Sequence, residues 1–390
     1  NNHFLVFQKA MKLLLIFGQC SGLNPVTGIL ETDITKVFLS LLIGLAQTIA
    51  ASLCAYKILS HSISIRGLGY VVFYLCAACS TFTFQRVATK WPALMKQLHN
   101  CNLQEYVDPT LKRKCYSVCF AVMFISIAFT EVIDCPTGED MVLYQEFVKK
   151  MFPWVFELNI VYYYYLPVGV ILQVHKFQIL NVISTLTWNY SDMLIICVSI
   201  YLTSILKCIN KKIQTSYDNL FLPSSYWRCL REDYNRATRL VRSFDDVISS
   251  VVLISFGTNL FFICLQLFYC LPQYLRAKCP NYPSGPFGGY EHVAYLVLSL
   301  CYLFGRSLAL SLIAAGVHTA SLAPAPALYN VAPSMYCSEV QRFLDQIHGD
   351  TIALSGLQFF YVTRELVLSV AGTIVTYELV LLQFSNEDAT

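Results

Sequence analysis

Long stretches without charge recur along the chain, and they restrict its fold more than any other feature. A helix needs about 20 apolar residues to cross the hydrocarbon core of a bilayer. Seven stretches are long and apolar enough, and they are residues 37–56, 67–85, 115–130, 177–206, 247–275, a run that begins at 292, and 366–384. The sequence therefore predicts an all-α membrane protein with seven transmembrane helices.

The overall composition supports this interpretation. Hydrophobic residues make up 56% of the 390 residues and charged residues only 13%, whereas soluble domains are about 25% charged. The net charge is +3, and no dense basic tract occurs. These values exclude a disordered chain, a soluble enzyme of ordinary composition and a nucleic-acid-binding protein.

The distribution of Lys and Arg predicts the orientation, because cytoplasmic loops carry the excess of these residues. Segment 89–114 holds five of them and segment 207–246 holds eight. The poorer segments between the spans, with two each, are 57–66, 135–166 and 272–289. Both rich segments lie on one side only if 158–206 crosses once, which excludes an eighth span at 158–174. The N-terminus is then cytoplasmic and the C-terminus extracellular, opposite to G-protein-coupled receptors.

We expect a single domain over residues 1–390, because no low-complexity linker interrupts the chain. Its expected parts are an amphipathic lead-in at the inner membrane interface, an aromatic extracellular cap, two cytoplasmic anchor segments and a last transmembrane helix; these are residues 1–31, 135–166, 207–246 with 320–352, and 353–384. The charged pattern of 210–246 predicts a paired helical stalk, and a further cytoplasmic helix is expected at about 337–349.

No motif for catalysis or cofactor binding occurs in a sensible context. We therefore expect neither an enzyme nor a cofactor or metal. Most of the 16 cysteines lie in apolar runs, where a thiol behaves as a small apolar group. Cys135, Cys270 and Cys279 flank spans, and the sequence leaves open whether any of them pair. Asn189 begins an Asn-Tyr-Ser site within a span, so no glycan is expected there.

The last apolar stretch carries a specific signature, TYELVLLQF at 376–384. Thr-Tyr, five mostly apolar residues and then Gln-Phe in the last span resembles the insect gustatory receptor family. The longer string LVLSVAGTIVTYELVLLQF is similar to the sugar-receptor branch of that family. The strings WNYSD at 188–192 and GRSL at 305–308 are similar to it as well.

This resemblance implies a ligand-gated, non-selective cation channel that acts as a taste receptor for sugars. In that family four subunits surround one pore, the last helix lines it, and a cytoplasmic bundle of helix ends anchors the tetramer. The implied location is the plasma membrane, where lipids surround the protein. The implied partners are a small sugar, permeant cations and three further copies or related receptors.

The last helix has its own pattern beside the motif. A Glu within a span is costly and should face protein or water, which singles out Glu378. Hydroxyl, amide and apolar groups that share a helix face suit a narrow pore. The candidate pore residues are Thr376, Glu378, Val380, Gln383 and Phe384. Gln383 and Phe384 are expected to form the gate at the outer end. The alternative is ordinary helix packing with Glu378 paired to Arg306 or Arg364.

Polar and aromatic residues in the outer halves of the other spans form a candidate sugar pocket. Sites for sugars combine an aromatic platform with carboxylates and amides. Trp188 and Asp192 fit this description, since a spacing of four places them on one helix face. The candidate ligand-binding residues are Glu131, Asp134, Trp188, Asp192, Asn259, Phe262, Gln266, Tyr295, Tyr302 and Arg306.

Each of these residues also has a structural interpretation. Trp188 suits core packing, and Arg306 suits a salt bridge to Asp192 or Glu131. Asn259 suits a bond to another helix, and Tyr295 suits the aromatic belt at the membrane boundary.

Two other functions remain open from the sequence. A secondary transporter would also explain charged residues inside spans, although no internal repeat is visible. An odorant-type channel would share the fold but have an apolar pocket.

Overall fold

The computed structural model of the chain describes residues 2–387 except for 24–25, 28–30, 33, 61–64, 102, 104–105, 107, 129–167, 218–221, 270–290 and 334–335. Its helices are α1 (Asn2–Cys20), α2 (Ile34–Ser60), α3 (Ile65–Asn100), α4 (Leu111–Ala128), α7 (Val168–Tyr217), α8 (Ser224–Tyr269), α10 (Glu291–Leu322), α11 (Ala325–Tyr329), α12 (Ser338–Gly349) and α13 (Arg364–Glu387). Strands β1 (Val26–Thr27) and β2 (Glu31–Thr32) form one short antiparallel pair. The expected extracellular cap at 135–166 lies outside the described residues.

Five of the described helices are long and apolar enough to cross a membrane. The candidate spans are Thr35–Ser60, Leu68–Asn100, Leu180–Thr215, Ser224–Phe268 and Val297–Tyr329. The predicted runs 115–130 and 366–384 fall largely in α4 and α13, which are not among these five. The all-helical class is therefore confirmed, and the number of seven spans stays a prediction.

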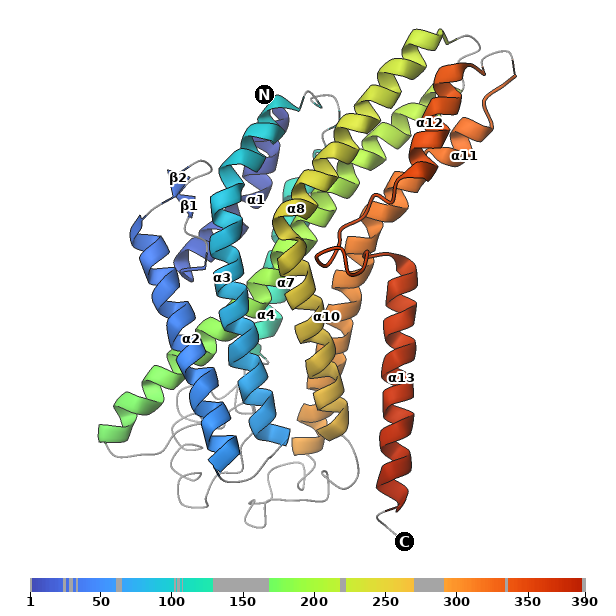
Figure 1. Cartoon of the computed structure of the whole chain (residues 1–390). Helices are drawn as coiled ribbons and strands as arrows, with labels where there is room; N and C mark the ends of the chain where they lie inside the picture. Colours follow the sequence, from blue (N-terminus) through green and yellow to red (C-terminus); the bar gives the residue numbers. More distant parts are fainter. Residues whose placement is uncertain are drawn as a thin grey trace.

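The long helices run side by side as a bundle (Figure 1). Helix α11 packs against the C-terminal part of α7, and α12 packs against the N-terminal part of α8. Helix α7 is the central one, because 78% of its apolar window is buried and no other candidate span exceeds 39%. Helix α13 stands at one edge, where it packs against α10 and α8. The core thus follows α7, and the helix with the receptor signature is peripheral within one chain.

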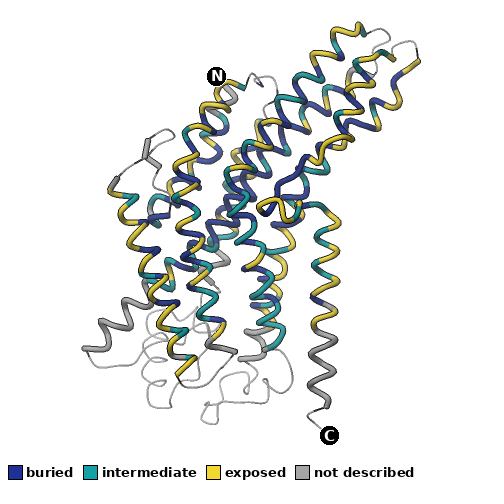
Figure 2. The backbone as a smooth tube through the Cα atoms, viewed as in Figure 1, coloured by how far each residue is buried: buried dark blue, intermediate teal, exposed yellow. Residues whose placement is uncertain are grey.

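The outward face of α2 is exposed along much of its length (Figure 2). Among its exposed large apolar side chains, six recur at helical spacing: Phe38, Leu42, Leu45, Ile49, Leu53 and Tyr56. An uncharged exposed stripe of this length is unusual on a water-facing surface. It indicates a face that contacts lipid, in agreement with a membrane protein.

The N-terminal lead-in is part of the bundle. Phe7, Met11 and Leu14 of α1 are buried in the main core, and the Phe7 ring lies 4.6 Å from that of Tyr201 on α7. The spacing of these residues places them on one face of the helix. The amphipathic pattern predicted for this segment therefore serves packing against α4 and α7.

The last helix begins later than predicted. Residues 353–384 were expected to be one helix, but α13 begins at Arg364. Before it, the chain makes a turn in which Ser355 and Tyr361 pair as an isolated bridge. Leu357 and Gln358 have φ values of 48° and 62°, and this left-handed backbone is incompatible with a right-handed helix. The turn was not predicted because the apolar composition of residues 353–363 is compatible with a helix.

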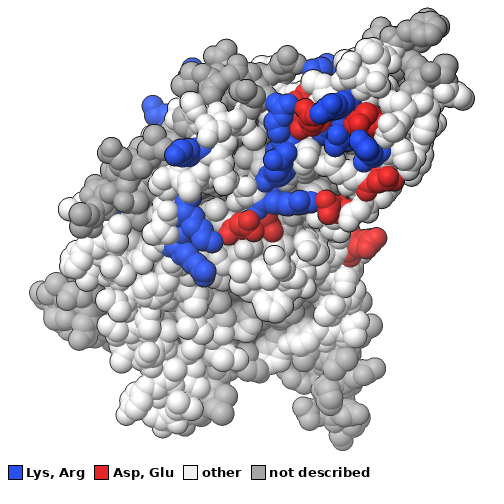
Figure 3. Space-filling model, turned by 45° about the horizontal axis from the view of Figure 1, so that its top comes forward, with Lys and Arg blue, Asp and Glu red and all other residues white. Residues whose placement is uncertain are grey.

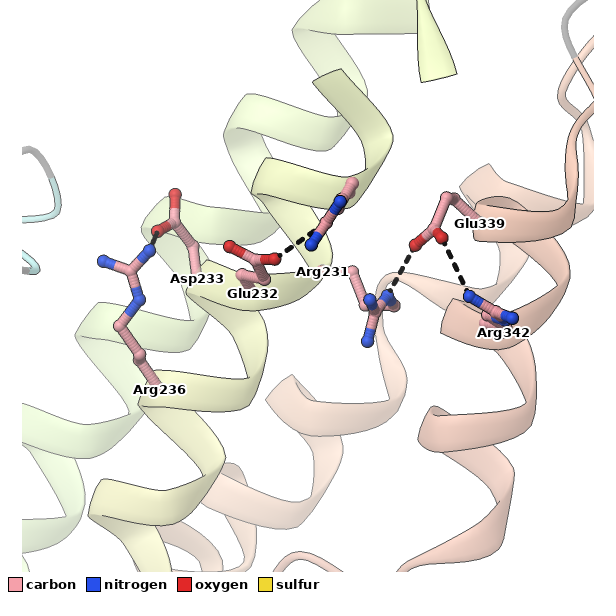
Figure 4. Close-up of polar contacts among 7 residues, drawn as sticks. Arg231, Glu232, Asp233, Arg236, Glu339 and Arg342 are labelled. Carbon is pink, nitrogen blue, oxygen red and sulfur yellow. Dashed lines mark hydrogen bonds and ion pairs between the residues drawn. The ribbon is translucent and has the colours of Figure 1, made fainter. Parts of the chain in front are cut away.

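Charged side chains gather on one side of the molecule (Figure 3), and among them are ion pairs of α8 and α12. Glu339 of α12 lies between Arg231 of α8 and Arg342, at 3.0 and 3.1 Å (Figure 4). Desolvation opposes the charge on Glu339, but the hydrogen bond and charge of Arg231, with help from Arg342, lower its pKa. An ion pair therefore joins α12 to the charged part of α8, as the helical pattern of both segments allows.

Candidate functional site

Three helices bring polar residues together inside the bundle. Asp192 comes from α7, Ser255 and Asn259 come from α8, and Arg306 comes from α10. Ser255 and Asn259 lie four residues apart and so share one face of α8. Polar groups in an apolar bundle need partners, and these four side chains are partners of one another. We call them, together with Trp188, the polar cluster.

The centre of the polar cluster is a buried ion pair. Arg306 Nε donates a hydrogen bond of 2.7 Å to Asp192 Oδ2, and Nη2 lies 2.5 Å from the same oxygen but off the line of a hydrogen bond. The side chains are 6% and 0% exposed. Of the carboxylates considered as partners for Arg306, Asp192 is the one that pairs with it. A charge buried this completely is tolerable only when paired.

Two residues of α8 complete the bonds of the carboxylate. The Ser255 hydroxyl donates to Asp192 Oδ1, and the Asn259 amide lies 3.4 Å from Oδ2. The Asn259 carbonyl oxygen accepts a 2.9 Å bond from Trp188 Nε1. Asn259 therefore links the indole to the ion pair, which is the helix-to-helix bond that its structural interpretation predicted.

Aromatic contacts fix the position of Trp188. The Arg306 guanidinium lies 4.9 Å from the centre of the indole ring, and the ring of Phe262 lies 5.0 Å away on another side. A cation over an aromatic face is attracted by the ring quadrupole. Trp188 is nevertheless only half-buried, so part of its surface is left for a further contact.

A crevice opens beside Trp188 and Ser255, between α3, α7 and α8. Its enclosed space is narrow, about 10 Å³, which is room for roughly one water molecule. The lining residues are Phe73, Cys76, Ala77, Ser80, Ser184, Trp188, Ser191, Ile254, Ser255 and Thr258. Five of these side chains carry a hydroxyl group and two are aromatic, but the surface that they leave accessible in the crevice is mostly apolar.

The lining residues on α3 were not predicted as site residues. Phe73, Cys76, Ala77 and Ser80 recur at i, i+3, i+4 and i+7, which is the pattern of one helix face. This spacing was readable in the sequence, but small and apolar residues at helical spacing are typical of any packed helix. Nothing in their chemistry marked the face as part of a crevice.

The remaining predicted ligand residues lie elsewhere or are not described. Gln266 donates a 2.8 Å bond to Ser299, which joins α8 to α10, and Tyr302 is half-buried on α10. Tyr295 belongs to α10, but its side chain is outside the described part of the chain. Glu131 and Asp134 fall in the undescribed segment 129–167.

The candidate pore residues all belong to α13. Thr376 is exposed, and its hydroxyl donates a 2.9 Å bond to the carbonyl of Gly372. The side chains of Glu378, Val380, Gln383 and Phe384 lie outside the described residues. Arg306, one alternative partner for Glu378, is occupied by Asp192.

The chain is similar to known gustatory receptors over most of its length. The sequence model of the family described as "Trehalose receptor" matches residues 2–390. The gustatory receptor for sugar taste 64f of Drosophila melanogaster is 30% identical over 98% of this chain and 81% of its own length. The gustatory receptor 5a for trehalose of the same species is 28% identical over 98% of this chain and 86% of its own.

The fold also has a solved counterpart. The insect olfactory receptor OR5 from Machilis hrabei, in complex with eugenol, superimposes with a TM-score of 0.69. The alignment covers 98% of this chain and 99% of that one at 19% sequence identity. At this identity the likeness shows a shared fold.

Proposed function

Because this chain belongs to the trehalose receptor family of insect gustatory receptors, we propose that it is a sugar-gated, non-selective cation channel. The family consists of receptors and not of enzymes. The observation that carries the proposal is the match over residues 2–390, and the narrow crevice beside the half-buried Trp188 gives the place where a ligand could act. We further propose a plasma-membrane homotetramer of seven-span subunits, in which α13 lines the shared pore.

The orientation follows from the distribution of charge. The charged end that contains Arg231 and Glu339 would face the cytoplasm. The opposite ends of the helices would face outside, so a sugar would enter the crevice from there. The peripheral place of α13 in one chain supports this arrangement, since a helix that lines a shared pore must face other subunits.

The crevice is the proposed sugar site, and because it has room for roughly one water molecule in this conformation, it must widen when a sugar binds. A sugar would lay a C–H face on Trp188 and exchange hydrogen bonds with Ser184, Ser80 and Ser255. Asp192 and Arg306 would act by holding Trp188 in place, because their bonding groups already face one another. Glu131, Asp134, Tyr295 and Tyr302 stay candidates for the outer part of the site. A ligand opens the pore only if it binds the open state more tightly.

Whole-cell current tests this proposal. Cells that express this chain alone are exposed to a panel of mono- and disaccharides and to apolar odorants. The proposal predicts a cation current evoked by at least one sugar. Sugar uptake without current would favour the transporter, and current evoked only by odorants would favour an odorant-type channel.

Substitutions in α13 test whether this chain forms the pore. Gln383→Ala and Phe384→Ala are each expected to raise the current in the absence of sugar, because the constriction at the gate widens. Glu378→Gln is expected to reduce selectivity for cations. Leu382→Ala is the matched control, since Leu382 is an apolar residue about 100° from Gln383 and about 160° from Phe384 around the helix. Unchanged leak and permeability in the gate variants would contradict the assignment of the gate.

A further inference from the structure

The turn that precedes α13 is tightly built. We call residues 352–362 the linker turn; it connects α12 to α13. Leu354 and Val362 are fully buried, and the Val362 N–H donates a 2.8 Å bond to the Leu354 carbonyl. Between these two residues in the chain, the Gly356 N–H donates a 3.0 Å hydrogen bond to the carbonyl of Phe360. The linker turn is therefore a packed structure with a defined shape.

Its backbone adopts a conformation that other contacts must maintain. Leu357 and Gln358 are consecutive non-glycine residues with φ of 48° and 62°, a region that bulky side chains rarely occupy. At Gly356, an added Cβ would lie 2.4 Å from Cζ of Phe360. Backbone strain persists only where the surroundings enforce it, and it often occurs at switch regions.

Helix α8 supplies the enforcing contact. Asp245 Oδ1 accepts a 2.6 Å bond from the Ser355 N–H, and Oδ2 accepts a 2.7 Å bond from the Ser355 hydroxyl. Ser355 is completely buried. The ring of Phe360 adds a second contact, 5.7 Å from Phe256 of the same helix. We call the Asp245–Ser355 contact the clasp.

The same helix carries part of the polar cluster. Ser255 and Asn259, which bond Asp192, follow Asp245 by 10 and 14 residues on α8. At the helical rise per residue, about 15 to 21 Å separate the clasp from these contacts. One continuous helix therefore touches the candidate ligand site at one point and the base of α13 at another.

We propose that the clasp couples the ligand site to the pore, with Asp245 as the positioning residue that makes α13 follow the movement of α8. This inference rests on the proposed function. A sugar that displaces α8 through Ser255 would move the linker turn through Asp245. Without the clasp, the sugar would still bind, but less of its binding free energy would reach α13.

Sugar-evoked current tests the coupling. The variants are Asp245→Ala, Ser355→Ala, their combination, and Asp245→Asn, which keeps the shape and an acceptor for the Ser355 N–H. Asp246→Ala is the matched control, because this neighbouring carboxylate is exposed. Currents are normalised to labelled receptor at the cell surface, and sugar binding is measured as thermal stabilisation of the purified protein.

Each Ala variant is expected to raise the half-activating sugar concentration by about tenfold and to lower the maximal current, because bonds to a charged group are lost. Sugar binding to the purified protein should change little. The double variant should resemble the single ones, since both changes remove one contact, while Asp245→Asn should recover part of the response and Asp246→Ala should match the wild type.

Wild-type sensitivity in both Ala variants, or a weakened response explained by weakened binding, would overturn the coupling role. Additive effects in the double variant would do the same. A wild-type chain with no sugar current would instead refute the proposed function, so the two failures are distinguishable.

Discussion

Arg306→Met is expected to destabilise the protein by about 3–5 kcal/mol, because it leaves the Asp192 carboxylate buried without its counter-charge. Combining it with Asp192→Asn should recover most of the loss, since no charge is then buried and the amide oxygen still accepts from Ser255. The readout is the thermal midpoint of the detergent-solubilised protein, followed by size-exclusion chromatography.

Arg342→Met is the matched control for this substitution. The Arg342 side chain is 67% exposed and pairs with Glu339 on the surface of α12, so its loss should cost below about 1 kcal/mol. If Arg306→Met and Arg342→Met lower the midpoint equally, or if the double variant is no more stable than Arg306→Met, then the ion pair is not the centre of the polar cluster.

Trp188→Ala is expected to abolish the sugar response at concentrations that saturate the wild type. The substitution removes the proposed platform and its contacts with Arg306 and Phe262. Trp188→Phe keeps an aromatic face but loses the bond from Nε1 to Asn259, so it should reduce sugar potency by about tenfold. Both are measured as concentration–response curves, normalised to surface expression.

Trp91→Phe provides the comparison for Trp188→Phe. Trp91 is 2% exposed on α3 and is not among the residues that line the crevice. Its substitution should lower expression without changing the sugar concentration for half-activation. If Trp188→Phe behaves in the same way, Trp188 is a packing residue and the sugar site lies elsewhere.

The sequence predicted the chemistry of the site better than its geometry. A deep Arg and a deep Asp must find partners, so the pairing of Arg306 with Asp192 was among the expected outcomes. The crevice face of α3 was not predicted, because small residues such as Cys76 and Ser80 occur on packed helix faces as often as on faces that line a crevice. It depends on which helices become neighbours in three dimensions.

The linker turn was not predicted from the sequence, for a different reason. The segment before Arg364 is apolar enough to continue a helix, and its left-handed residues are Leu357 and Gln358 rather than Gly. The contact that holds this conformation comes from Asp245, 110 residues earlier in the chain. Local sequence cannot report a restraint from so far away, whereas the receptor signature in α13 could be recognised because it is local.

Current through a bilayer that contains only the purified chain tests the central claim most directly. Sugar is added to the side opposite the charged end that holds Arg231 and Glu339. A cation-selective current that appears with sugar, and that Trp188→Ala removes, is the predicted result. Two results would contradict a sugar-gated channel formed by this chain alone. One is sugar transport without channel current, and the other is sugar binding to the protein without any sugar-evoked current.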